Sequence, residues 1–445
     1  MSSKTDPSDH EEIPGPDGLP LVGSMRSFAD DQLAFYERTA REHGSVASFQ
    51  VGRHEFVLLS DPEHVERVLL EKKDVYVKGE EFQNRLRPIL GSALMTSQGE
   101  YWQSQRQALN PAFGPEAIER YSTEVTQITE RYRDRWTDGE VREMLPEMQS
   151  LTVEILARAL FNTDIREETD EITSALEAVL THAARQIRRP VRVPGWVPTP
   201  GNRSYQRAVE DIYEIAERIL DERANDHHEN DVLSLLRASD ADFSREELRD
   251  QIVTLLLAGH ETTALGLTYT LHALGTNPET LMTLQDELDE VLDGGAPTMA
   301  DLPELTYTEQ VMKEGLRIYP PSHELVRETA EPDVVDGYRI PEGTNVLVSQ
   351  WVTHRDPAYF EDPETFRPER WTDEFESQLP GFAYFPFGGG LRRCIGDHFA
   401  KMELSLVLAT LLQEWAVDPV NDELELSPSI TNRPAGPIEM ELQRR

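Results

Sequence analysis

The sequence is poor in cysteine and in positive charge. Only one of its 445 residues is a cysteine, Cys394, so no disulfide can form within the chain. Lysine and arginine together number 43 against 82 aspartate and glutamate residues, which gives a formal net charge of −39. Such a surface repels phosphate groups, so the composition excludes a nucleic-acid-binding protein and disfavours an anionic membrane as a partner.

Long hydrophobic runs are also missing. No stretch approaches the roughly 18 consecutive apolar residues that a membrane-spanning helix needs. The first 30 residues have neither the apolar core nor the small-residue cleavage site of a secretory signal. We therefore expect a cytoplasmic protein without a transmembrane segment.

Lysine is the scarcer of the two basic residues, because only 6 of the 43 lysine and arginine residues are lysines. A very acidic, lysine-poor composition looks like that of a salt-loving organism. At molar salt the screening length falls to about 3 Å, which suppresses the self-repulsion of such a chain. An acidic solvating tail is the alternative, but the carboxylates are spread along the whole sequence. We expect a halophilic protein that dilute buffer destabilises.

The pattern of apolar residues predicts one domain over residues 14–445, after a disordered N-terminal tail over residues 1–13. A short hairpin is expected first, then long amphipathic helices to about residue 277, and strands and turns after residue 330. The expected strands and the last helix are Val46 to Val51, Glu55 to Leu59, Tyr338 to Ile340, Asn345 to Val348, and Gly396 to about Trp415. The fold class is therefore mainly α with a small β part.

Two helices have well-marked ends. The first opens on a capping box from Ser244 to Glu247 and stops at Gly275, and its roughly 30 residues span about 45 Å. The second opens on a similar pattern from Thr306 to Glu309 and must end before Pro320.

The sharpest chemical feature is a glycine-rich loop that carries the only cysteine to the start of the last helix. It reads Phe-Gly-Gly-Gly-Leu-Arg-Arg-Cys-Ile-Gly over residues 387–396. Glycines let the backbone approach a flat ligand closely, and amides at a helix start favour a thiolate over a thiol. A lone cysteine is more often a small buried apolar residue, but three glycines and two arginines beside it favour a metal ligand or a nucleophile.

This loop resembles the haem-binding signature of the cytochrome P-450 family, whose fixed positions are filled by Phe387, Gly390, Arg392, Cys394 and Gly396. The resemblance implies the family's fold, a triangular helical prism around haem b (iron protoporphyrin IX). It implies that Cys394 is the axial thiolate ligand of the iron and that Arg392 pairs with a haem propionate. Gly388 is expected to contact the cofactor as well.

The middle of the first of those two helices supports the resemblance. A glycine within a helix costs about 1 kcal/mol relative to alanine, so Gly259 indicates that something lies close against the helix. In the family this segment is the oxygen-binding groove. Ala258 and Gly259 would face the haem, and Glu261 with Thr262 would form the acid–alcohol pair that relays protons. A zinc-protease motif is excluded, because its second histidine would be residue 264, which is alanine. A solvated helix face is the plainer interpretation of Glu261.

Further positions gain meaning from the same resemblance. Glu314 and Arg317 are three residues apart, and as an exposed pair they would contribute about 0.3 to 0.5 kcal/mol. In the family such a pair joins a later arginine, here Arg370, in a buried structural triad. In the family, an aromatic and a basic residue four positions apart on one helix donate to the haem propionates, and Trp102 and Arg106 match this pair. The plainer alternative is that they belong to an ordinary amphipathic helix. The resemblance implies that Arg327 is a further propionate partner.

The implied reaction inserts one atom of O2 into an apolar small molecule. The sequence contains no dinucleotide or flavin motif, so electrons must come from a separate ferredoxin or flavoprotein, for which Arg393 and Lys401 are candidate docking contacts. Alternatives are a peroxygenase or an isomerase on the same fold, or a non-catalytic haem-binding carrier or sensor. The Glu261–Thr262 pair argues against all of these.

One local excess of arginine bears on the substrate. No carboxylate lies between Glu177 and Glu210, while six arginines do. In the family this region covers the substrate channel, which suggests a fatty acid or another lipid-like anion. The plainer interpretation is that these arginines pair with the acidic body of the protein. The six residues are Arg185, Arg188, Arg189, Arg192, Arg203 and Arg207.

Overall fold

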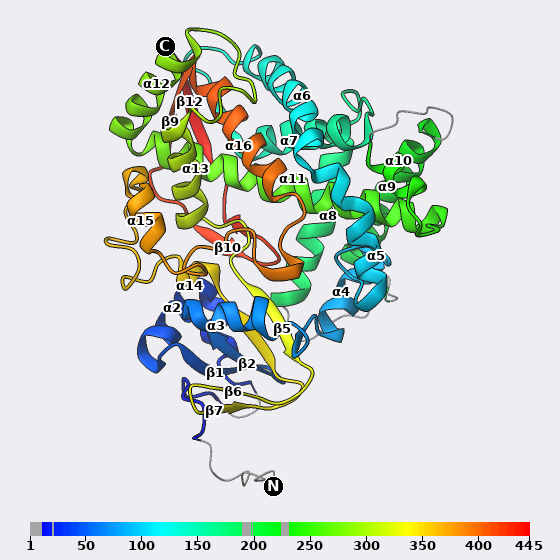
Figure 1. Ribbon diagram of the computed structural model, residues 1–445, viewed down its shortest axis with the longest axis vertical. Helices are drawn as coiled ribbons and strands as arrows, with labels where there is room; N and C mark the ends of the chain where they lie inside the picture. Colours follow the sequence, from blue (N-terminus) through cyan, green and yellow to red (C-terminus); the bar gives the residue numbers. More distant parts are fainter. Residues whose placement is uncertain (1–10, 20–21, 189–196, 198, 224–230) are drawn as a thin grey trace. The chain divides into compact units, whose positions relative to one another are not determined.

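A computed structural model describes residues 11–19, 22–188, 197, 199–223 and 231–445, without the side chains of residues 81, 82, 85 and 183–188 (Figure 1). Helices make up most of these residues and the strands are short, so the prediction of a mainly α protein with a small β part is confirmed. The chain divides into two compact units. Unit 1 comprises Met1–Gln83, Ser322–Thr365 and Glu374–Cys394, and unit 2 comprises Asn84–Pro321, Phe366–Asp373 and Ile395–Arg445. The single domain over residues 14–445 stays a prediction beside this division.

Unit 1 is built on a five-stranded sheet with the strand order β1-β2-β8-β5-β3. Strands β2 and β8 pair in parallel and the other neighbours are antiparallel. Valine and leucine side chains of the strands form its apolar core with Phe385 and Tyr76. The strands are β1 (Val46–Val51), β2 (His54–Leu59), β3 (Tyr76–Val77), β5 (Leu325–Thr329) and β8 (Asn345–Val348), with a separate hairpin of β6 (Asp333–Val335) and β7 (Tyr338–Ile340).

Short helices complete unit 1. They are α1 (Met25–Asp30), α2 (Gln32–His43), α3 (Pro62–Glu66) with a π-helical turn over Arg67–Glu71, α14 (Gln350–Thr353) and a 3-10 turn over Gly390–Arg392, while α15 (Asp373–Gln378) begins at the unit boundary. Of the predicted tail, residues 1–10 lie outside the described residues. Glu11 bridges Tyr338, and the carbonyl of Ile13 accepts a hydrogen bond from the Ser48 hydroxyl.

Unit 2 is helical. Its long helices bury leucine, isoleucine and valine side chains against one another, and α11 packs along α7 while α16 packs along α6 (Figure 1). The helices are α4 (Glu80–Leu90, which begins in unit 1), α5 (Gly99–Leu109), α6 (Pro115–Arg133), α7 (Met144–Phe161), α8 (Thr169–Arg188), α9 (Pro200–Glu222), α10 (Val232–Ala238), α11 (Arg245–Gly275), α12 (Pro278–Leu292), α13 (Thr306–Ile318) and α16 (Asp397–Leu412), with 3-10 turns over Asn110–Phe113 and Pro368–Arg370.

Two small sheets complete unit 2. Strand β12 lies between β4 and β9, and β10 pairs with β11 in a hairpin. Their bounds are β4 (Val141–Glu143), β9 (Trp415–Pro419), β10 (Leu426–Pro428), β11 (Asn432–Pro434) and β12 (Glu439–Arg444). The β10–β11 hairpin is tied to α11, because the Tyr269 hydroxyl donates to the carbonyl of Asn432.

The two helices with marked ends form where the sequence predicts them. Helix α11 has both hydrogen bonds of the capping box between Ser244 and Glu247 and ends at Gly275. Helix α13 begins at Thr306 without a side-chain cap of its own. Its first amides, those of Tyr307 and Thr308, donate instead to the carboxylate of Glu287 on α12 at 2.6 and 2.8 Å. The predicted capping pattern at Thr306 to Glu309 is therefore wrong. The first amides of α13 are capped by a side chain of another helix instead.

Within the described part of the chain, none of the helices combines the length and the apolar character that crossing a bilayer requires.

Candidate functional site

The glycine-rich loop before Cys394 is held by its own backbone. The Cys394 amide donates to the carbonyl of Phe387 at 3.0 Å, and the Gly388 amide donates to the carbonyl of Phe385 at 2.9 Å. Gly390 has φ +65°, and a Cβ there would lie 1.9 Å from the carbonyl oxygen of Leu69. No other residue type fits this position, because an L side chain would be strained and would overlap the backbone.

Cys394 is an exposed cysteine at the end of that loop. It stands two residues before Gly396, the N-cap of α16. The loop thus presents the Cys394 side chain from a backbone that its own hydrogen bonds hold in place. Whether Cys394 and the loop residues Phe387, Gly388 and Gly396 bind a cofactor stays a prediction.

Three cations gather in the same unit as the thiol. Strands β3 and β5 pair Tyr76 with Thr329 and Val77 with Glu328, so Lys78 follows β3 at the level of Arg327. Burial and the charges of Arg327 and Arg392 hold the pKa of Lys78 well below its ordinary value. Burial and the charge of Arg392 lower the pKa of Arg327 to about 10.

A cluster of like charges in a partly buried place is suited to binding an anion. Arg327 is 8% exposed, and burial also lowers the pKa of Arg392. Carboxylates are the natural partners of two guanidinium groups and an ammonium. The donor set of unit 1 therefore fits a cofactor that has a metal for the thiolate and carboxylates for the cations. The sequence analysis found Arg327 and Arg392 and missed Lys78, which belongs to no motif.

In unit 2, one face of α11 is less buried than the rest of the helix. From Asp250 to Leu274 every residue is buried except Ala258, Gly259 and Thr262. Thr262 lies four positions after Ala258 and three after Gly259, so it shares one side of the helix with both. The Thr262 hydroxyl donates to the carbonyl of Ala258 at 2.8 Å.

The packing of unit 2 explains why residue 259 is a glycine. A Cβ at this position would lie 2.9 Å from the Cδ1 atom of Leu156 on α7. The sequence predicts that something lies close against α11 at Gly259, and in unit 2 this neighbour is α7. A contact of Ala258 and Gly259 with a cofactor stays a prediction.

Glu261 points away from solvent and is 1% exposed. Its Oε1 atom forms an ion pair with Arg433 Nε of β11 at 2.8 Å, and its Oε2 atom accepts a hydrogen bond from Gln149 Nε2 of α7 at 2.8 Å. The Thr431 hydroxyl lies 3.5 Å from Oε1. The plain interpretation of Glu261 as a solvated residue is wrong, because a buried carboxylate with these partners belongs to a built polar cluster.

The neighbouring His260 is completely buried. Neither of its ring nitrogens has a hydrogen-bond partner among the described residues. Burial, and to a smaller extent the charge of Arg433, lowers the pKa of His260 to about 3, so its ring is neutral at physiological pH. Sequence reasoning missed Arg433, Gln149 and the character of His260, because these residues come together only through the packing of α7, α11 and β11.

The structure brings Glu314, Arg317 and Arg370 together in the interior of unit 2. Arg317 donates to both oxygens of Glu314 at 2.8 and 2.9 Å, and Arg370 Nε donates to Oε1 at 3.0 Å. The Glu314 side chain is fully buried. Two further donors complete the cluster, the Trp371 indole nitrogen at 2.8 Å and the Arg367 amide at 3.0 Å.

The other predicted cofactor residues lie on α5. Trp102 is 8% exposed, and Arg106 Nε donates to Asn110 Oδ1 at 3.1 Å. Their spacing places both on one side of the helix, as the sequence predicts. Contact with a propionate stays a prediction for both residues.

Comparison with known proteins adds the following. The model of the family described as Cytochrome P450 matches residues 13–439. Cyclooctatin synthase of Streptomyces melanosporofaciens is 36% identical over 97% of this chain and 95% of the relative. Cyclooctat-9-en-7-ol 5-monooxygenase of the same species is 36% identical over 91% of this chain and 89% of the relative, and pentalenene oxygenase of Streptomyces avermitilis is 34% identical over 92% of each.

Proposed function

Because this chain belongs to the cytochrome P450 family and is a P450 monooxygenase, we propose that Cys394 is the axial ligand of the iron of haem b. The family binds haem and has the mainly helical P450 fold. The single observation that carries the proposal is the exposed thiol on the Gly390 loop, in the same unit as the Lys78, Arg327 and Arg392 cations. When bound, haem supplies an iron at which dioxygen is activated.

Other residues of the chain would bind the cofactor or deliver protons. Lys78, Arg327 and Arg392 are suited to pair with the haem propionates, with Trp102 and Arg106 as further partners. The loop residues Phe387, Gly388 and Gly396 and the helix residues Ala258 and Gly259 would contact the cofactor. Glu261 and Thr262 would deliver protons. One atom of O2 enters the substrate as a hydroxyl group and the other leaves as water, which consumes two electrons and two protons.

We propose an uncharged apolar substrate. Two relatives are named for pentalenene and for cyclooctat-9-en-7-ol, and neither compound carries an ionised group. The fatty-acid hypothesis depends on six arginines, and Arg203 and Arg207, which are exposed on α9, are the only two whose side chains are described. The side chains of Arg185, Arg188, Arg189 and Arg192 lie outside the described residues, so this hypothesis stays a prediction.

Incorporation of labelled oxygen tests the function. The purified chain is reduced by NADPH through a ferredoxin and its reductase under 18O2, with pentalenene and a long-chain fatty acid as separate probes. We expect one 18O atom in a product of pentalenene and none without the redox proteins. Peroxide-driven oxidation that needs no redox protein would favour the peroxygenase alternative, and haem binding without turnover of either probe would favour a carrier or sensor.

Binding separates the two substrate classes. If the substrate is a fatty acid, replacing Arg188 and Arg189 by glutamine should weaken its affinity while leaving that of pentalenene unchanged. Unchanged fatty-acid affinity in this variant would remove the anionic-substrate hypothesis.

The electron donor and the cellular setting are further proposals. A separate ferredoxin or flavoprotein would dock near the exposed Arg393 and near Lys401, because an acidic chain offers few basic contacts. The acidic, lysine-poor composition supports a halophilic protein of the cytoplasm.

A further inference from the structure

The buried carboxylate of Glu261 has both oxygens occupied. Arg433 Nε forms an ion pair with Oε1 and Gln149 Nε2 donates a hydrogen bond to Oε2, each at 2.8 Å. The Thr262 hydroxyl donates to the Ala258 carbonyl and not to Glu261. A carboxylate that only accepts hydrogen bonds cannot deliver a proton until it has received one. Glu261 therefore needs a route to solvent, although only 1% of it is exposed.

Arg433 is the end of this cluster that is nearest to water. Its side chain is 15% exposed against 1% for that of Glu261. Its Nη1 atom lies 3.4 Å from the hydroxyl oxygen of Thr181 on α8. The guanidinium thus bridges α8 and the carboxylate of α11.

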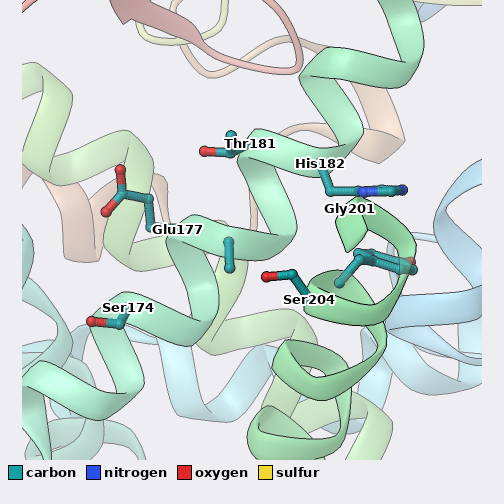
Figure 2. A pocket seen from close by; sticks show the side chains of 8 residues that line it. Ser174, Glu177, Thr181, His182, Gly201 and Ser204 are labelled. Atoms are coloured by element: carbon teal, nitrogen blue, oxygen red, sulfur yellow. The ribbon is translucent and has the colours of Figure 1, made fainter. Parts of the chain in front are cut away.

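Thr181 lines a hollow of about 280 Å³ between α8 and α9 (Figure 2). In Figure 2 the side chains of Ser174, Glu177 and Thr181 come from one helix and Ser204 from the other. Ser174, Glu177 and Ser204 are exposed, so the hollow is open to solvent and lined by groups that bind water. A polar path leads from it through Thr181 and Arg433 to Glu261.

We propose that Arg433 is a positioning residue for proton delivery, which aims the Glu261 carboxylate at water in the hollow between α8 and α9. This inference rests on the proposed function. Arg433 does not give up its own proton, because a guanidinium stays charged in proteins. A proton passes from water to the carboxylate, then to the Thr262 hydroxyl, whose own proton goes to the dioxygen being reduced. The two protons used in each turnover are replaced from bulk water, and the two electrons come from the ferredoxin or flavoprotein.

A purely structural ion pair is the competing explanation. The guanidinium would then only tie β11 to α11, and its loss would lower stability without changing the fate of oxygen. The two explanations differ in the ratio of hydrogen peroxide to water, because peroxide is released when protons arrive too slowly to cleave the O–O bond.

The experiment uses Arg433→Gln, Arg433→Lys and Thr181→Val in the full haem-loaded chain. Hydrogen peroxide formed per NADPH consumed is measured with a ferredoxin and its reductase and no added substrate. We expect the peroxide fraction relative to water to rise about tenfold in Arg433→Gln, because groups that orient a ligand or catalytic residue typically contribute 10- to 100-fold. Arg433→Lys should restore part of the loss, and Thr181→Val should give a smaller rise.

Arg444→Gln is the matched control. Arg444 lies on β12 and forms an ion pair with Glu414 at 3.4 Å. The Arg444 side chain is 65% exposed. Its replacement should leave the peroxide fraction unchanged. An unchanged fraction in Arg433→Gln, or an equal rise in Arg444→Gln, would overturn the proposal. If Arg433→Gln does not fold, the lysine and Thr181 variants carry the same comparison.

Infrared absorption gives a readout that does not depend on turnover. Removing the guanidinium leaves a buried carboxylate without its counter-charge, which favours the neutral acid. Arg433→Gln should gain a protonated-carboxyl band that is missing in the Glu261→Gln/Arg433→Gln double variant. Absence of this band would contradict the role of Arg433. A chain that shows the band but consumes no NADPH would contradict the proposed function and leave the link between Arg433 and Glu261 standing.

Discussion

Individual side chains fix the interior of unit 2, and Glu314 is the clearest case. Its buried carboxylate accepts hydrogen bonds from Arg317, Arg370, the Trp371 indole and the Arg367 amide. Burial lowers the pKa of Arg370 in spite of the attraction of Glu314. Charges buried in this way are tolerated only as a complete set.

Replacement of Glu314 by glutamine should therefore strongly lower the stability of the fold. It leaves Arg317 and Arg370 buried without a counter-charge, and breaking a buried pair typically costs about 3 to 5 kcal/mol. We expect a fall of that size in the free energy of unfolding, measured by urea denaturation. The control is Glu309→Gln, which removes an ion pair of α13 with Lys313 whose Glu309 side chain is 54% exposed, and should change stability by less than about 0.5 kcal/mol. Equal effects of the two variants would contradict the structural role of Glu314.

At this scale the sequence identifies residues that stand in motifs. Cys394, Glu261 and Glu314 are found because glycines, a helix pattern or a fixed spacing mark them. Lys78, Gln149 and Arg433 stand in no local pattern, and they reach their partners only through strand pairing or helix packing. No property of one segment alone could have indicated them.

Helices and strands were predictable where local chemistry decides them. The capping box at Ser244 and the Gly275 end define α11, and alternating residues around a tight turn define β1 and β2. The start of α13 depends on Glu287 of another helix, which is a tertiary contact. The order of the sheet in unit 1 is likewise beyond local reasoning, because β8 and β5, far along the chain, pair with β2 and β3.

The buried middle of α11 makes stability depend on pH. In the unfolded chain a histidine has a pKa of about 6.5. In the folded state burial lowers the pKa of His260 to about 3. Between these values the unfolded state binds more protons, so stability falls as the pH falls. The contribution is fully present above about pH 6.5 and shrinks by up to about 1.4 kcal/mol per pH unit below it.

Replacement of His260 by leucine should reduce this pH dependence. Between pH 7 and pH 5 the loss in the free energy of unfolding should be smaller by about 2 kcal/mol in His260→Leu than in the unsubstituted chain. Urea denaturation at the two pH values measures the difference. His398→Leu, at an exposed position of α16, is the control and should keep the original slope. If His260→Leu also keeps it, His260 does not titrate as described.

The whole molecule is dominated by its net charge of −39. Like charges on one compact chain repel one another and oppose folding, and salt weakens this repulsion. The screening length shrinks from about 10 Å at 0.1 M to about 3 Å at 1 M.

Thermal stability should therefore rise with salt concentration. We expect the melting temperature to increase steadily from dilute buffer to molar potassium chloride, measured by circular dichroism at constant pH. A melting temperature that does not change with salt would show that the acidic composition has no such role.

The most direct test of a haem-thiolate enzyme is the visible difference spectrum of the dithionite-reduced protein with carbon monoxide, recorded in molar salt. With Cys394 as the iron ligand, the Soret band moves to the long wavelength from which the family takes its name, and Cys394→Ala loses this band. Repeating the spectrum at several salt concentrations separates loss of the native state from loss of the ligand. A short-wavelength band at every salt concentration, in the unsubstituted chain as in Cys394→Ala, would contradict the assignment of Cys394.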